Sequence, residues 1–95
     1  MKLRYTRLAL ADLEQAHDFI LAENPRAAQA VMARIREAVE RLATFPDSGR
    51  PGRVDGTREL VVANTPFVVA YRVTPGTVDV LAVIHGSRRW PSSFG

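Results

Sequence analysis

The spacing of apolar residues changes once along this chain, and that change limits the fold more than any other feature. Between residues 8 and 44, apolar side chains recur every three or four positions, as on one face of a helix. After Gly56 they alternate with polar residues or run almost without interruption, which is typical of strands. The sequence therefore predicts an α+β fold, with helices in the N-terminal half and most of a sheet in the C-terminal half.

Two helices are expected in the N-terminal half, separated by a very short connection. The first covers Leu8–Ala22, and the second begins at Asn24-Pro25 and ends near Thr44. Asn24 is a good N-cap, and Pro25 suits the first helical position because its missing N–H has no helical partner there. The short connection predicts an antiparallel helical hairpin. Residues 46–53 follow as a loop, because their prolines and glycines do not continue a helix.

Four strands are expected, one before the helices and three after them. They cover Lys2–Thr6, Thr57–Val62, Phe67–Val73 and Thr77–His85. The last three are joined by connections too short for a parallel crossover, and Pro75-Gly76 matches a type II turn. The order β-α-α-β-β-β predicts an antiparallel sheet packed against the helical hairpin, in a single domain spanning residues 1–95.

Composition removes several classes of protein. The chain has no cysteine, which excludes disulfides and thiolate sites, and its two histidines make a metal site unexpected. We expect no cofactor. No apolar run approaches the roughly 20 residues of a membrane helix, and the first residues lack the apolar core of a signal peptide. These features predict a cytoplasmic protein with no membrane partner.

The charge balance is compatible with an acidic partner, either a protein or a nucleic acid, but does not require one. Thirteen basic residues face ten acidic ones, giving a net charge of +3, and Lys2 is the only lysine. Arginine presents a planar set of donors that suits carboxylates and phosphates. A bias toward arginine is equally consistent with a GC-rich genome, so the charge by itself does not identify the partner.

The residues that could carry chemistry gather in the C-terminal half. His85 ends the last strand, Arg58 begins the first strand after the loop, and the tail contains Arg88-Arg89-Trp90. If the strand Phe67–Val73 is central, Arg58 and His85 flank it and could share one surface. A histidine that transfers a proton and arginines that hold a phosphate would suit cleavage of an RNA backbone.

Each of these residues also has a purely structural interpretation. His85 at a strand end is compatible with a hydrogen-bonded structural residue, and the tail arginines with solvated charges. Trp90 next to Pro91 is expected to anchor the tail on the core rather than to stack on a base. His17, on the apolar face of the first helix, is expected in the core or in an interface, and Tyr71 is expected to serve packing.

The order of elements and several segments together resemble the RelE/ParE superfamily of bacterial toxins from type II toxin–antitoxin operons. The segments are Phe45–Pro51, Arg58–Leu60, Val68–Val73 and Val80–Arg88. The resemblance spans the whole chain. It implies a hetero-oligomer with a cognate antitoxin, ParD-like or RelB-like, whose acidic C-terminal segment folds on binding. The basic charge of the chain agrees with such a partner.

The superfamily contains two activities, and the resemblance leaves both open. RelE-like members cut mRNA on the ribosome with basic residues on the sheet, whereas ParE-like members poison DNA gyrase. Glu59, Val61 and Val68 stand where the RelE pattern has catalytic lysines and arginine. Only Arg88 fits a RelE catalytic arginine. A gyrase-poisoning toxin is therefore preferred, and the alternative is a ribosome-dependent mRNA endonuclease that uses Arg58, His85 and Arg88.

Two binding surfaces follow from the preferred interpretation. The basic tail, with Arg88, Arg89 and Trp90, is expected to contact the target. The antitoxin is expected to cover the helical hairpin and part of the sheet edge, because so small a chain offers few other extended apolar surfaces. Its candidate contacts, each of which could equally belong to the core, are Leu13, His17, Ile20 and Val31.

Overall fold

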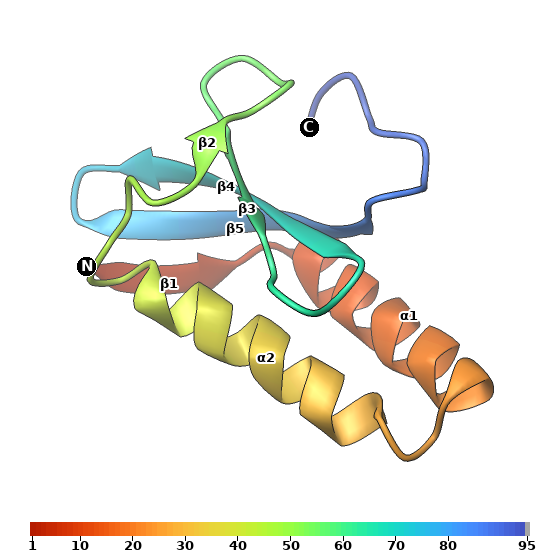
Figure 1. The fold of residues 1–95 in the computed structure, drawn as a ribbon. Coiled ribbons are helices and arrows are strands. Elements are labelled where there is room, and N and C mark those ends of the chain that lie inside the picture. The colour runs from red at the N-terminus through yellow and green to blue at the C-terminus, as the bar shows by residue number, and fades with distance from the viewer. Residues whose placement is uncertain (95) are drawn as a thin grey trace.

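The computed structural model describes residues 1–94 and confirms the α+β fold (Figure 1). Two helices lie side by side on one face of a five-stranded sheet whose strand order is β1-β5-β4-β3-β2. The elements in chain order are β1 (Lys2–Tyr5), α1 (Arg7–Glu23), α2 (Ala28–Arg41), β2 (Arg50–Pro51), β3 (Arg58–Val61), β4 (Phe67–Thr74) and β5 (Thr77–His85).

The meander predicted for the C-terminal half is confirmed. β3, β4 and β5 pair antiparallel in sequence, with Glu59 opposite Ala70 and Val69 opposite Val83. β1, however, pairs with β5 in parallel, with Leu3 opposite Val78, so the sheet is mixed rather than wholly antiparallel. Between β1 and β5 the chain runs through both helices and the rest of the sheet. That connection is long enough for the crossover that parallel pairing requires.

One strand was not predicted. β2 lies inside the segment expected to be a loop, and pairs antiparallel with β3 through Arg50 and Glu59. The fully buried Tyr71 of β4 fixes the segment that leads into this strand. Its hydroxyl donates to the Pro46 carbonyl at 2.7 Å and accepts from the Gly49 N–H at 2.9 Å. A Cβ at Gly49 would lie 2.6 Å from that hydroxyl, so only glycine fits here without displacement.

The connection between the helices also differs from the prediction. Asn24 does not cap α2; it is the C-cap of α1, and its N–H donates to the Ile20 carbonyl at 2.7 Å. A turn then follows, in which the Ala27 N–H donates a hydrogen bond to the Asn24 carbonyl at 3.0 Å. α2 begins at the next residue, Ala28. The prediction was wrong because the backbone of Asn24 is used to end one helix rather than to start the next.

The core lies between the helices and the sheet. Ile35 and Val39 of α2 meet Val69 and Val80 of the sheet, and all four are fully buried. Tyr71 packs with Leu42 and Val78 in a second cluster, as expected for a packing residue. Of the residues described, neither helix is both long and apolar enough to cross a membrane.

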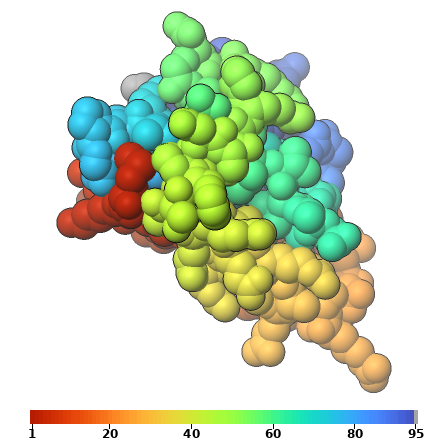
Figure 2. All heavy atoms as spheres, turned by 60° about the vertical axis from the view of Figure 1, so that its left-hand side comes forward, coloured from red at the N-terminus to blue at the C-terminus, as the bar shows by residue number. Residues whose placement is uncertain are grey.

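The segment between α2 and β3 closes one side of the molecule. In Figure 2 these yellow-green residues cover the middle of that face and lie beside the red N-terminus. The Met1 ammonium donates to the Ala43 carbonyl at 3.0 Å, which joins the start of the chain to the end of the helical hairpin. Because Lys2 pairs with Thr77 at the start of β5, the N-terminus lies at the other end of that strand from His85.

Candidate functional site

His85 lies at the end of β5 between two aromatic rings. Phe19 of α1 and Phe67 of β4 contact it edge to face, at centroid distances of 5.6 and 5.5 Å. The Ser87 N–H donates to Nδ1 at 3.2 Å, and the Ser87 hydroxyl lies 2.7 Å from the same atom. Because a backbone N–H only donates, Nδ1 is an acceptor, and the neutral ring carries its proton on Nε2.

A cavity of about 250 Å³ opens beside His85. Its apolar part comes from α1 and the end of the sheet, and its polar lining includes Asp12, His85 and the tail arginines Arg88 and Arg89. The sequence-predicted residues His85 and Arg88 therefore line one cavity. The apolar lining includes Leu8, Ala16, Phe19, Phe67 and Val83.

Asp12 is a member of this cavity that the sequence analysis missed. Its carboxylate accepts a hydrogen bond from the Val83 N–H at 3.0 Å. Burial raises the pKa of Asp12 above 3.8, although the Val83 hydrogen bond and the charge of Arg88 act in the opposite direction. Nothing in the spacing of the helical acids singles out Asp12, because its role depends on which strand lies beside it.

Arg58 does not join His85 and Arg88. It is paired with Tyr71, whereas His85 is paired with Phe67, four positions away along β4, or roughly 13 Å at 3.3 Å per residue. Its guanidinium donates to the Gly49 carbonyl at 2.8 Å and lies 3.6 Å from the Asp47 carboxylate. The structure thus separates Arg58 from the other two residues expected of an endonuclease.

Glu59, Val61 and Val68 share the face of the sheet that points away from the helices. Val61 is directly opposite Val68, Glu59 is two positions earlier on the same strand, and Leu60 between them packs against the core. Glu59 and Val68 are only 3% and 6% exposed. These three positions therefore present one carboxylate and two apolar side chains.

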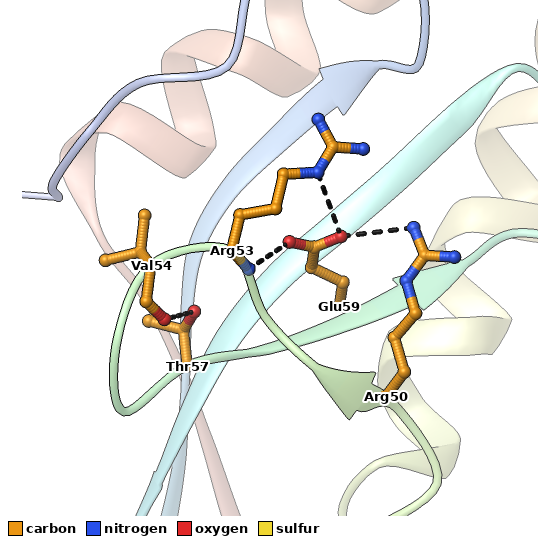
Figure 3. Close-up of polar contacts among 5 residues, drawn as sticks. All are labelled: Arg50, Arg53, Val54, Thr57 and Glu59. Carbon is orange, nitrogen blue, oxygen red and sulfur yellow. Dashed lines mark hydrogen bonds and ion pairs between the residues drawn. The ribbon is translucent and has the colours of Figure 1, made fainter.

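Two arginines neutralise Glu59, as Figure 3 shows. Arg50 approaches Oε1 at 3.1 Å and Arg53 approaches it at 3.7 Å, while the Arg53 N–H donates to Oε2 at 2.7 Å. The guanidinium of Arg53 also lies 4.2 Å from the centre of the Trp90 ring, a cation–π distance. Trp90 of the tail therefore lies against Arg53 of the β2–β3 loop.

The four helical residues expected to contact an antitoxin differ in exposure. Ile20 is 7% exposed and belongs to the core, and Leu13 and Val31 pack against it from partly buried positions. His17 is half-buried. The large apolar side chains that α1 leaves exposed are others, namely Leu8, Leu10, Phe19 and Leu21. Within residues 1–94, no three histidine or acidic side chains gather as metal ligands would.

Comparison with known proteins gives the same family from sequence and from structure. A family model described as the ParE toxin of type II toxin–antitoxin system, parDE, matches residues 3–90. Y4kP of Sinorhizobium fredii, described as a candidate toxin, is 43% identical over 90 residues, which are 95% of this chain and 93% of that protein. Toxin RelE2 of Caulobacter vibrioides is 38% identical over 84 residues, covering 88% and 93% of the two chains.

A solved structure agrees with these relatives. A chain in the chromosomal ParDE toxin–antitoxin system of P. aeruginosa superposes with a TM-score of 0.81 at 31% identity. The match covers 90% of this chain and 95% of that one, so the likeness extends over helices, sheet and most of the loops.

Proposed function

Since this chain belongs to the ParE toxin family of type II toxin–antitoxin systems, we propose that it arrests growth by binding DNA gyrase rather than by cutting mRNA. A toxin of this family has an antitoxin partner. The family and the antitoxin partner follow from the comparisons, whereas the choice of gyrase as the target is argued from the residues of the sheet and the tail.

The far face of the sheet is the observation that carries the proposal. Cleavage of RNA requires cations or donors where charge develops on the phosphate. At the three positions where a RelE-like enzyme would supply them, this chain has the buried Glu59 and two valines, Val61 and Val68. An anion and two hydrocarbons do not stabilise a developing negative charge. The separation of Arg58 from His85 points the same way.

The tail supplies the surface for a target. Arg88 and Arg89 are exposed, and Trp90 is held at one point by Arg53, so the two arginines project from a segment with a defined position. Interfaces commonly concentrate their binding energy in arginine and tryptophan. We therefore assign target binding to Arg88, Arg89 and Trp90.

A supercoiling assay with purified gyrase tests this function, with ribosomes translating an mRNA in parallel. The wild-type chain should abolish supercoiling, let cleaved DNA accumulate and leave the mRNA intact. A triple variant with Arg88→Ala, Arg89→Ala and Trp90→Ala should lose this effect while still binding antitoxin. Cut mRNA with unaffected gyrase would overturn the assignment, as would full activity of the triple variant.

For the antitoxin, we propose that its acidic segment covers the helical hairpin. The exposed side chains of Leu10 and Leu21 share one flank of α1, whereas Leu8 and Phe19 lie on the opposite flank beside the His85 cavity, because residues two apart are about 200° apart around a helix. The basic charge of the chain favours an acidic partner. Of the candidates expected from the sequence, Leu13 and His17 lie partly buried on the Leu10 and Leu21 side of α1, and Val31 lies partly buried on α2. Hydrogen exchange with and without antitoxin should show protection within residues 8–44. Unchanged exchange there would contradict the proposal.

The alternative, a ribosome-dependent endonuclease, retains two supporting observations. Toxin RelE2 is 38% identical, and His85 and Arg88 line the same cavity. Such an enzyme would have to work without Arg58, which is bound to Gly49 and Asp47 and lies opposite Tyr71 in the middle of β4. The parallel ribosome assay distinguishes the two functions directly.

A further inference from the structure

The C-terminal tail contacts the β2–β3 loop through a cation–π pair. The guanidinium of Arg53 lies 4.2 Å from the centre of the Trp90 ring. The indole Nε1 is buried and has no hydrogen-bond partner among residues 1–94. The indole is therefore held through its ring face rather than through its N–H, and Arg53 is the charged group on that face.

Arg53 is itself held by a buried group. The Glu59 side chain is 2% exposed, and its Oε2 accepts the Arg53 N–H at 2.7 Å while Oε1 faces the Arg53 guanidinium at 3.7 Å (Figure 3). One carboxylate thus fixes both the backbone and the side chain of Arg53. Because Glu59 belongs to the sheet, this contact ties the loop to a rigid element.

The same carboxylate binds a second arginine that does not take part in the cation–π pair. Arg50 approaches Oε1 at 3.1 Å, and its side chain is 54% exposed, against 52% for Arg53. The two arginines therefore share a partner and a degree of exposure. They differ in that Arg53 covers Trp90.

We propose that Arg53 and Glu59 are positioning residues for the tail: Glu59 holds Arg53, Arg53 holds Trp90, and the docked Trp90 sets how Arg88 and Arg89 are presented to the target. This inference rests on the proposed role of the tail in target binding. It assigns a function to Glu59, a buried carboxylate on the face of the sheet that points away from the helices. It also predicts that the chain is active with its tail docked.

Trp90 is the only tryptophan of the chain, so its fluorescence reports the tail alone. Arg53→Ala should raise the population of undocked tail about 5- to 30-fold, seen as stronger acrylamide quenching and lower anisotropy of Trp90. Arg50→Ala should leave both signals near wild type. Arg53→Lys keeps a cation over the ring and should restore docking in part, because a lysine lacks the planar stacking surface. Glu59→Gln, which keeps one acceptor oxygen, should fall between Arg53→Ala and wild type.

Growth arrest on induction gives the second readout, and it does not depend on which target is correct. Arg53→Ala should weaken arrest, Arg50→Ala should not, and Arg53→Lys should recover it in part. Unchanged Trp90 quenching in Arg53→Ala, or full arrest by a variant with a released tail, would overturn the positioning role. Arrest by the wild-type chain without inhibition of gyrase would instead overturn the proposed target and leave the positioning role standing.

Discussion

The carboxylate of Asp12 on α1 accepts a 3.0 Å hydrogen bond from the backbone N–H of Val83 on β5. β1 covers that edge of β5 only as far as Val80, which is opposite Tyr5. Beyond this point no other strand within residues 1–94 pairs with that edge of β5, and the helix supplies an acceptor that a strand would otherwise provide. The contact fixes α1 against the end of the sheet where His85 and the tail lie.

Asp12 and Asp79 should affect the pH dependence of stability with opposite signs. Burial raises the pKa of Asp12 above 3.8. The contribution of Asp12 to the free energy of unfolding is therefore fully present below pH 3.8 and is lost as pH rises through the folded-state pKa. The hydrogen bond from Arg4 lowers the pKa of Asp79 below 3.8. The contribution of Asp79 to the free energy of unfolding is therefore fully present above pH 3.8 and is lost as pH falls through the folded-state pKa.

Carboxyl NMR titration and denaturation at several pH values would measure these effects. Asp12→Asn keeps an acceptor for Val83 and should gain stability relative to wild type between about pH 4 and pH 7. Asp79→Asn should lose stability relative to wild type over the same range. Asp12 titrating below 3.8 would contradict the burial described here.

Replacing Tyr71 by phenylalanine should destabilise the chain by about 1–3 kcal/mol, the usual cost of leaving buried groups without a partner. The change removes the hydroxyl from the Pro46 carbonyl and the Gly49 N–H without opening a large cavity. Urea denaturation would measure it. Gly49→Ala should disturb the same loop, because the new Cβ would meet the Tyr71 hydroxyl at 2.6 Å. Gly76→Ala, at a φ of 81° with open space around it, is the control and should cost less.

His85 can be tested without removing the packing around it. His85→Phe keeps an aromatic ring between Phe19 and Phe67 but removes both ring nitrogens. If the chain poisons gyrase, this variant should inhibit supercoiling as the wild type does. A catalytic histidine would instead be revealed by a loss of about 10²- to 10⁴-fold in mRNA cleavage.

Substitutions at core positions of α1 should lower the free energy of unfolding much more than substitutions at its surface positions. Ile20→Ala removes a buried side chain and should cost about 2–5 kcal/mol. Leu10→Ala, at 54% exposure, should change stability by less than about 0.5 kcal/mol. Under the proposed antitoxin contact, Leu10→Ala should nevertheless weaken antitoxin binding in a titration. Equal affinity of Leu10→Ala and wild type would place the contact elsewhere.

The elements of the fold were predictable where their signal is local. The apolar spacing of the helices and the short turn at Pro75-Gly76 act within a few residues, and α1, β4 and β5 form close to where expected. α2 also forms, but it begins at Ala28 and ends at Arg41, inside the range predicted for it. β2 escaped prediction because a two-residue strand has no period. It exists because Tyr71 and Gly49 bring residues 46–51 alongside β3.

The candidate site was predictable only in part. His85, Arg88 and Arg89 are close in sequence, so their grouping around one cavity at the end of β5 followed from the chain itself. Arg58 was expected to join them, but strand pairing sets its distance along β4, and this register cannot be read from strand composition. Asp12 and Arg53 act through partners 71 and 37 positions away in the sequence (83 − 12 and 90 − 53), a separation over which no pattern signals a contact.

By itself, the sequence determined the two helices, the three-stranded meander and the absence of thiol chemistry, since these follow from side-chain period, turn residues and composition. The tertiary structure alone decided that β1 joins β5 in parallel, that Glu59 is buried between two arginines, and that Trp90 docks on Arg53. These features depend on which backbone edges and side chains are left without partners once the sheet has formed. That is a property of the assembled fold and not of any one segment.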